Sequence, residues 1–347
     1  MSGASVGRVR LGLVGVGRIG AMHAHAIADL REQFAARDVD LTLAVTDVAE
    51  EHARAVAAEV GATAVPGGAA GLLAAGVDGL VVATGTPTHP ELIRAGVEAG
   101  VPVFCEKPVA GSVADSLPVL AHVAEHGGTV QIGHQRRFDA GYLEARRRFQ
   151  AGELGWLHSF RAVTADVSPP PVAFLATSGG LFRDCSVHDF DILRWITGRE
   201  IVEVYARGSN RGDPAIGEVG DVDTALAVVT LDDGTVGTVT ATRYNGAGHD
   251  VRLELSGSDA SVMVGLDEAT ALRSTEPGVD FPAGTAHRTF AERFAGAYRN
   301  ELAAFVEVVL GERDNPCPPD EAVAASRVAD AAQASLASGR PERVELG

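Results

Sequence analysis

The chain has 347 residues, 46% of them hydrophobic and 22% charged, which is typical of a folded globular protein with room for two domain cores. Its net charge of −17 argues against a nucleic-acid partner, because phosphate binding needs a basic patch and the arginines are scattered. The three cysteines are too few and too far apart for a disulfide framework or a Cys-x-x-Cys metal site. The N-terminal segment lacks signal-peptide features and no apolar run approaches the ~20 residues of a membrane helix, so we expect a cytoplasmic protein without a membrane partner.

The first third of the chain alternates strand-like and helix-like segments. Strands are expected over 8–16, 40–47, 78–84, 101–106 and 129–133, and helices over 18–36, 49–60, 89–100 and 115–126. Strands that alternate with helices of this length predict a parallel sheet covered on both faces. We therefore expect an α/β fold that begins with a doubly wound, NAD-binding Rossmann domain over residues 1–130.

After residue 131 the pattern changes. A basic helix over 139–152 and a strand over 156–166 precede a Pro-rich loop and a segment, 179–198, whose second half has helical apolar spacing. Five alternating segments separated by turn residues then predict a large, mostly antiparallel sheet. They span 200–209, 221–231, 234–244, 249–258 and 260–265, and helices over 291–311 and 320–339 follow. We expect an α+β domain over 131–347 that binds substrate.

The motif GVGRIG, residues 15–20, directly follows a predicted strand and opens a helix. In this context it predicts dinucleotide binding: Gly15 allows the tight turn, Gly17 lets the backbone approach a pyrophosphate, and Gly20 lets helix and strand pack closely. The start of the helix, with Arg18 and Ile19, would face the phosphates with its partial positive charge.

Asp47 ends the second strand. A carboxylate there accepts hydrogen bonds from the adenosine ribose hydroxyls and repels a 2′-phosphate. Val48 and Ala49 follow, in place of the cation that would welcome NADP. The sequence therefore favours NAD over NADP.

Thr84 and Gly85 end the next strand, at the carboxyl edge of the sheet where ligands of such folds bind. His89 lies near the start of the following helix. We expect these three residues to contact the cofactor. An ordinary strand-to-helix turn is the alternative interpretation.

The single lysine of the chain, Lys107, follows Glu106 at the end of a further strand of the same sheet, so both are expected beside the cofactor. An ammonium is a compact charge whose pKa burial can lower, whereas a guanidinium is a broad planar fork that stays protonated. The ammonium therefore suits the polarisation of one hydroxyl or alkoxide beside a nicotinamide. The alternative is that one lysine survived by chance in an arginine-rich composition.

Four motifs together, GVGRIG, CEKP, GHQRRFD and GGLFRDCSVHDFDILRW, resemble the Gfo/Idh/MocA family of NAD(P)-dependent oxidoreductases and above all its inositol 2-dehydrogenase branch. The likeness covers nearly the whole chain. Glu-Lys-Pro and Asp-x-x-x-His are its most specific parts, and they imply a polyol-oxidising site formed by Lys107, Asp184 and His188. The family resemblance also implies a homo-oligomer.

Asp184 and His188 are four residues apart, so they lie on one helical face. We expect His188 to accept the hydroxyl proton while the carbinol hydrogen leaves as hydride. Lys107 would stabilise the negative charge that develops on oxygen, and Asp184 would orient substrate or imidazole. Which of Lys107 and His188 is the formal base stays open. Asp189 and Asp191 are expected to cap or solvate the helix.

Substrate contacts are expected from Gln135, Arg136, Asp166 and His249. Against the inositol branch, Gln135 stands where Asn or Met is common, Ala165 replaces an arginine before Asp166, and His249 stands where some members have tyrosine. These differences keep the reaction class but leave the substrate open between myo-inositol, a related cyclitol, an aminocyclitol precursor and a pyranose.

The sequence thus predicts an NAD-dependent dehydrogenase of a cyclic polyol, most of all myo-inositol or a related cyclitol. No metal is expected, because His23 and His25 lie two apart on a helix and face different ways. One uncovered face of the second sheet favours a homo-oligomer, a dimer or a tetramer. The alternatives are a dehydrogenase of a pyranose, anhydrosugar or glycoside, or a keto-sugar reductase. A non-catalytic NAD-sensing regulator would predict loss of Lys107, Asp184 or His188, and all three are present.

Overall fold

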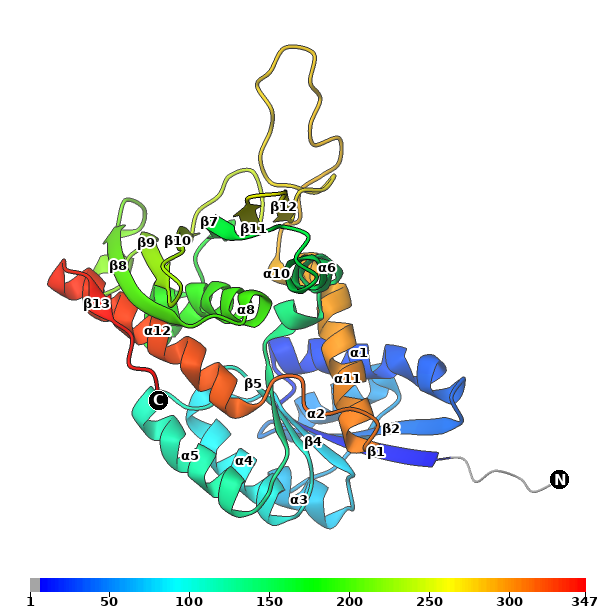
Figure 1. The fold of residues 1–347 in the computed structure, drawn as a ribbon. Coiled ribbons are helices and arrows are strands. Elements are labelled where there is room, and N and C mark those ends of the chain that lie inside the picture. The colour runs from blue at the N-terminus through cyan, green and yellow to red at the C-terminus, as the bar shows by residue number, and fades with distance from the viewer. Residues whose placement is uncertain (1–6) are drawn as a thin grey trace. The chain divides into compact units, whose positions relative to one another are not determined.

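The computed structural model describes residues 7–347. The first six residues, on which the expectation of no signal peptide partly rests, lie outside the described part. The chain divides into two compact units (Figure 1). The first comprises the residues through Gln135 together with Gly296–Val323, and the second comprises Arg136–Ala295 with Ala324–Gly347. The sequence-based division assigned all of 131–347 to the second domain and did not anticipate the return of residues 296–323 to the first. Within residues 7–347, no helix is both long and apolar enough to cross a membrane.

A six-stranded sheet forms the centre of the first unit. Its order is β3-β2-β1-β4-β5-β6, and all paired neighbours run parallel, which is the predicted doubly wound arrangement. Both faces are covered, so the central strands are almost entirely apolar; all four residues of β4 are buried. The strands are β1 Gly7–Val14, β2 Val39–Thr46, β3 Thr63–Ala64, β4 Gly79–Val82, β5 Val103–Glu106 and β6 Val130–Gly133.

Two hydrophobic cores lie on the two faces of this sheet. Helices α1, α2 and α11 enclose one core, in which Phe34, Phe104 and Phe305 are fully buried. Helices α3, α4 and α5 enclose the other, around residues such as Leu72 and Ile93. The helices are α1 Arg18–Ala35, α2 Glu50–Val60, α3 Gly68–Ala74, α4 His89–Glu98, α5 Val113–Glu125 and, from much later in the chain, α11 Ala295–Val309.

A seven-stranded sheet forms the centre of the second unit. Its order is β12-β11-β7-β10-β9-β8-β13, and only the β7–β10 pair is parallel, so the sheet is mostly antiparallel as predicted. The strands are β7 Leu157–Ala165, β8 Ile201–Ser209, β9 Thr224–Leu231, β10 Val236–Thr242, β11 Asp250–Gly257, β12 Ser261–Val264 and β13 Glu342–Arg343. The helices are α6 Ala140–Gln150, α7 Val172–Leu175, α8 Val187–Thr197, α9 Pro214–Glu218, α10 Phe290–Arg293 and α12 Pro319–Ser338, of which the residues through Val323 belong to the first unit.

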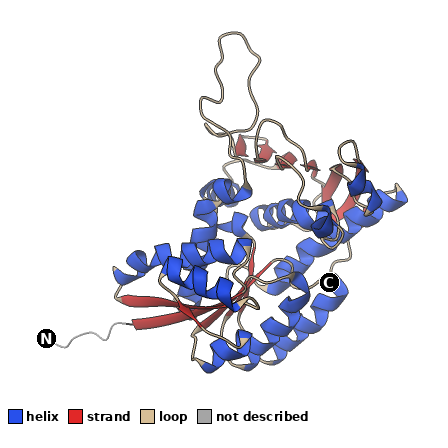
Figure 2. Ribbon diagram, turned by 180° about the vertical axis from the view of Figure 1, so that it is seen from behind, coloured by secondary structure: helices blue, strands red, loops and turns tan. Residues whose placement is uncertain are grey.

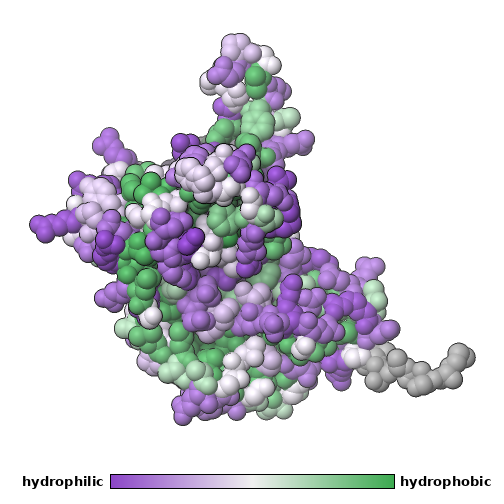
Figure 3. Space-filling view, in the orientation of Figure 1, coloured by the Kyte–Doolittle hydropathy of each residue, from purple (hydrophilic) through white to green (hydrophobic). Residues whose placement is uncertain are grey.

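Side chains alternate across the second sheet. In β9, Ala225, Ala227 and Val229 are buried, whereas Leu226 and Val228 on the opposite face are 44% and 40% exposed. After β12 the chain forms a long loop over residues 265–289 before α10, drawn in tan in Figure 2. This loop carries both hydrophilic and hydrophobic residues (Figure 3), and Leu266, Leu272 and Val279 are exposed on it.

Candidate active site

The glycine motif forms a tight turn between β1 and α1. Gly15 has φ +84°, a conformation that other residues rarely adopt. A Cβ on Gly20 would lie 1.9 Å from the backbone oxygen of Gly15, whereas nothing lies within 4 Å of the position that a Cβ on Gly17 would take. Arg18 and Ile19 begin α1, whose start has no side-chain cap. Open space at Gly17 beside the N-terminus of α1 fits a pyrophosphate.

Asp47, directly after β2, lies beside this turn. Its carboxylate accepts hydrogen bonds from the backbone N–H of Val16 at 2.8 Å and of Ala49 at 2.9 Å. The two bonds fix the carboxylate next to the glycine motif and leave it further lone pairs for a ribose hydroxyl. The contact between Asp47 and the ribose stays a prediction.

Thr84 and Gly85 follow β4 and precede a short 3₁₀ turn, Thr86–Thr88. His89, the first residue of α4, is buried. Its ring nitrogens lie 2.7 Å from the carbonyl oxygen of Pro108 and 3.1 Å from that of Thr84. The ring therefore joins the turn after β4 to the turn after β5. A direct contact of these residues with the cofactor stays a prediction.

Lys107 follows Glu106, the last residue of β5, at the carboxyl edge of the parallel sheet. Ligands of doubly wound folds bind at this edge, which agrees with the position expected from the sequence. Burial alone would raise the pKa of the Glu106 carboxyl, but its hydrogen bond with His23 lowers it. The charges of Lys107 and His89 lower the pKa of Glu106 further. An ionised Glu106 thus precedes Lys107 in the chain.

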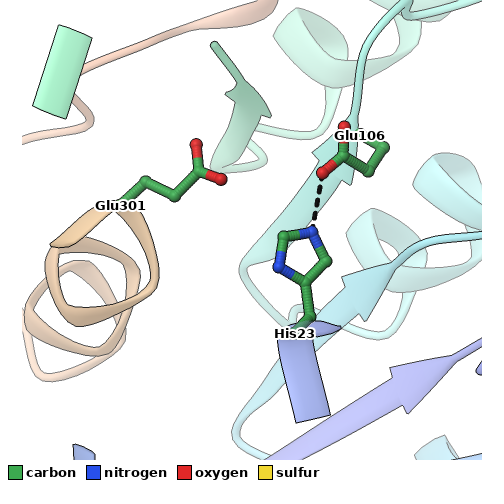
Figure 4. A group of neighbouring side chains, drawn as sticks. All are labelled: His23, Glu106 and Glu301. Carbon is green, nitrogen blue, oxygen red and sulfur yellow. Dashed lines mark hydrogen bonds and ion pairs between the residues drawn. The ribbon is translucent and has the colours of Figure 1, made fainter. Parts of the chain in front are cut away.

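Glu301 on α11 completes a buried group around Glu106 that the sequence did not indicate. His23 Nε2 lies 2.6 Å from Glu106 Oε1. A ring nitrogen of His23 and one carboxyl oxygen each of Glu106 and Glu301 lie within 4.8 Å of one another. Figure 4 shows the carboxyl group of Glu301 directed toward the Glu106–His23 pair. Burial first, and then the charge of Glu106, raise the pKa of Glu301 well above its usual value.

Asp184 and His188 belong to the second unit and lie on one continuous helical stretch. A π-helical turn, Phe182–Ser186, contains Asp184 and leads directly into α8, whose second residue is His188. The sequence predicted a helix here but not the wider turn, a rare conformation that is frequent at functional sites. The roles of Asp184 and His188 in catalysis stay predictions.

Arg243, just after β10, holds Asp184 in place and was not predicted. Its buried guanidinium lies 2.9 Å from the Asp184 carboxylate and 3.4 Å from that of Asp221. Burial alone would lower the pKa of Arg243, but its interactions with Cys185, Asp184 and Asp221 raise it. Arg243 therefore keeps its positive charge against Asp184.

Two further buried ion pairs hold α8. The expectation that Asp189 and Asp191 cap or solvate the helix is wrong, because both are 1% exposed. Asp189 lies 2.5 Å from Arg136 and accepts a hydrogen bond from Thr164 at 2.9 Å, and Asp191 pairs with Arg137 at 2.6 Å. The guanidinium of Arg136 is thus engaged within the protein. A contact between Arg136 and substrate stays a prediction.

Asp166 and His249 form a close pair. Their neighbours Ala165 and Asp250 face each other where β7 pairs with β11, and His249 Nδ1 lies 3.2 Å from Asp166 Oδ1. Nε2 of His249 is buried and has no hydrogen-bond partner among residues 7–347. Gln135, the first residue of a 3₁₀ turn after β6, is buried as well. Contacts of these residues with substrate stay predictions.

Two family models match the chain. Residues 9–134 match an oxidoreductase family with an NAD-binding Rossmann fold, and residues 142–263 match the GFO/IDH/MocA C-terminal domain. The chain belongs to the Gfo/Idh/MocA oxidoreductase family. It is therefore an oxidoreductase whose first unit contains an NAD-binding domain, as the glycine motif and Asp47 predicted.

Relatives within the Gfo/Idh/MocA family match nearly the full length of the chain. It is 40% identical over 331 residues to the myo-inositol dehydrogenase Hyg17 of Streptomyces leeuwenhoekii, covering 94% of this chain and 97% of the relative. The crystal structure of a myo-inositol dehydrogenase from Corynebacterium glutamicum has a TM-score of 0.87 at 30% identity, covering 98% and 100% of the two chains. The scyllo-inositol dehydrogenase of Lactobacillus casei, solved with bound NAD(H) and scyllo-inositol, has a TM-score of 0.84 at 28% identity, covering 97% and 99%.

Proposed function

We propose that this protein oxidises a secondary hydroxyl of a cyclic polyol, myo-inositol or a related cyclitol, to the ketone and reduces NAD. The single observation that carries the proposal is the position of the only lysine, Lys107, at the carboxyl edge of an NAD-binding sheet. The relatives support the substrate class, because they are named as dehydrogenases of myo- and scyllo-inositol.

Each site residue has a distinct role in the proposed reaction. His188 accepts the hydroxyl proton, and the Lys107 ammonium stabilises the negative charge that develops on the same oxygen. Asp184, held by Arg243 at 2.9 Å, orients substrate or the imidazole of His188. NAD, when bound, supplies the acceptor for the hydride that leaves the carbinol carbon.

The Asp166–His249 pair favours a second candidate substrate class. A histidine whose Nδ1 faces a carboxylate presents Nε2 as an acceptor for a substrate hydroxyl, and it stands where some inositol dehydrogenases have tyrosine. A histidine in place of this tyrosine suits a substrate ring whose hydroxyls are arranged differently from those of inositol. A pyranose, anhydrosugar or glycoside is therefore the alternative substrate. A keto-sugar reductase would use the same residues in the reverse direction. Cytoplasmic location and homo-oligomeric assembly also stay proposals.

The test is NADH formation, followed by absorbance, with NAD and NADP offered separately. The panel is myo-, scyllo- and chiro-inositol, glucose, xylose and an anhydrosugar. Turnover of a cyclitol with NAD is the expected result. Turnover of a pyranose alone would keep the reaction and overturn the inositol assignment, and preference for NADP would overturn the role given to Asp47. Lack of turnover of every compound in both directions, with NAD still bound, would favour the regulator.

A further inference from the structure

A chain of three buried ionisable groups leads from α11 to the residue before Lys107. Glu301 and His23 are fully buried, and the side chain of Glu106 is 16% exposed. The edges of Phe104 and Tyr298 pack against the His23 ring at 5.5 and 5.9 Å between centroids. Apolar rings offer no hydrogen bonds, so the polar atoms of this group must find their hydrogen-bond partners within the group.

Several polar atoms of this group have no hydrogen-bond partner among residues 7–347. They are Nδ1 of His23, both carboxyl oxygens of Glu301 and Oε1 of the neighbouring Gln131, whose amide donates to the backbone oxygen of Glu301 at 3.1 Å. A buried, unpartnered carboxylate is costly, whereas a carboxylic acid carries a donor of its own. The unpartnered atoms therefore indicate where a proton resides.

The proton belongs on Glu301 and not on Glu106. Two carboxyl groups this close in a buried site do not both ionise at neutral pH. Glu106 faces His23 Nε2 at 2.6 Å and also feels the charges of Lys107 and His89. The Glu301 carboxyl lies beside His23 and the negative charge of Glu106, so burial and like charge favour its neutral form.

A neutral carboxylic acid supplies the donor that Nδ1 of His23 lacks. A neutral imidazole offers one N–H donor and one bare nitrogen. With Nε2–H donated to Glu106, Nδ1 of His23 is the bare acceptor, and Figure 4 shows the Glu301 carboxyl directed toward this ring. The Glu301 O–H can donate to Nδ1 through one bridging water.

We propose that Glu301 is a positioning residue for Lys107: as a carboxylic acid it donates to His23, which holds the Glu106 carboxylate as the only negative charge of the group beside the lysine. The value of this arrangement for catalysis rests on the function proposed above. A second ionised carboxylate would bind the ammonium more strongly and draw it away from the substrate oxygen.

The first test measures the proton on Glu301 and needs no substrate. Glu301→Gln fixes the neutral form and keeps a donor. The stability contributed by a raised carboxyl pKa is fully present below the unfolded-state value, about 4.3, and is lost as pH rises through the folded-state pKa. Above about pH 5.5, the unfolding constant of the wild type relative to Glu301→Gln should rise with pH, by up to about tenfold per pH unit, until the folded-state pKa of Glu301 is passed. An equal pH dependence of the two proteins would overturn the proposal.

The second test links Glu301 to Lys107 through kinetics. Glu301→Gln should keep kcat within about threefold of the wild type, whereas Glu301→Met, which fills similar space but lacks a donor, should lower kcat about tenfold and move the pH profile of kcat/KM. Glu307, on the same helix and partly exposed beside Arg37, provides the matched control Glu307→Met, which should change neither. Equal kcat values and profiles for the Gln and Met variants of Glu301 would reduce Glu301 to a packing role and overturn the proposal.

The same three side chains offer a nitrogen and carboxylate oxygens, a donor set that divalent cations also use. Elemental analysis of the purified protein separates the two explanations. We expect less than stoichiometric metal, unchanged by Glu301→Gln. A stoichiometric divalent ion that is lost in this variant would overturn the acid and assign a metal site. If the protein turns over no cyclitol or sugar, the stability and metal measurements still decide the state of Glu301, so the two proposals fail separately.

Discussion

Lys107 is the only lysine of the chain and differs chemically from its 28 arginines. Its ammonium can place one donor on a single oxygen, whereas a guanidinium in the same place would spread its charge over a planar fork. We expect Lys107→Arg to lower kcat by about 10²–10³-fold, the usual effect of losing one donor to a developing oxyanion. NAD affinity, measured by fluorescence titration, should stay within about threefold.

The control for this variant is Arg54→Lys, an exchange in the opposite direction at an exposed position of α2. It should leave kcat unchanged. Undiminished turnover in Lys107→Arg would mean that the lysine does not polarise the oxygen, and the proposed mechanism would have to be withdrawn.

The Arg243 guanidinium is fully buried in the second unit, between the carboxylates of Asp184 and Asp221. Removing one partner of a buried ion pair typically costs about 3–5 kcal/mol, since the other charge stays buried without compensation. Arg243→Met should therefore lower the free energy of unfolding by about this amount, measured by urea denaturation. Arg161→Met, which removes an exposed contact to Glu254, should cost less than about 1 kcal/mol. Equal costs for the two variants would contradict the structural role of Arg243.

Local motifs explain which of these residues the sequence could predict. Lys107, Asp184 and His188 lie in short patterns whose neighbours in the chain set the context. Arg243 lies 59 residues from Asp184, and Glu301 lies far from both Glu106 and His23, so no spacing connects them before the chain folds. The same reason accounts for Asp189 and Asp191, which look like surface charges until Arg136 and Arg137 are brought against them.

At the scale of elements, strong periodicity decided what could be predicted. Every long strand and helix of the first unit was expected within a few residues of its observed ends. The short pair β3 and α3 was not, because the Gly- and Ala-rich residues 63–74 carry little pattern. The expected helix over 291–311 is divided into α10 and α11 around Phe294, and the π-helical turn before α8 has no signal in the spacing of apolar residues.

The β1–α1 turn allows a paired test of its glycines. A Cβ on Gly20 would overlap the Gly15 carbonyl, so Gly20→Ala should destabilise the fold and lower Tm. A Cβ on Gly17 meets nothing within 4 Å, so Gly17→Ala should keep the wild-type Tm but weaken NAD binding about tenfold or more, because the methyl group enters the pyrophosphate space. Calorimetry of both variants with and without NAD makes the comparison. A Gly17→Ala protein that binds NAD as the wild type does would contradict the placement of the pyrophosphate.

At the scale of the whole molecule, the second sheet presents apolar side chains on a face that the unit itself does not cover. Leu226 and Val228 are exposed there, and their register partners Thr240 and Thr238 lie on the neighbouring strand. We expect a second copy of the chain to cover this face. The double change Leu226→Glu and Val228→Glu should reduce the mass measured by light scattering to that of a monomer. Leu143→Glu, at an equally exposed leucine of α6, should not change the mass, and an unchanged mass in the double variant would contradict the interface.

The place of α11 in the chain has a consequence for synthesis. Leu302, Phe305 and Val306 are fully buried in the core of the first unit. In the chain, however, residues 136–295 of the second unit separate them from β6, the last strand of the sheet. The ribosome adds about 5–20 residues per second, so this helix emerges roughly ten to thirty seconds after residue 135. During that time the nascent cofactor domain lacks one wall and exposes Phe34 and Phe104 to the cell. The period before α11 docks is therefore when the growing chain most needs a chaperone.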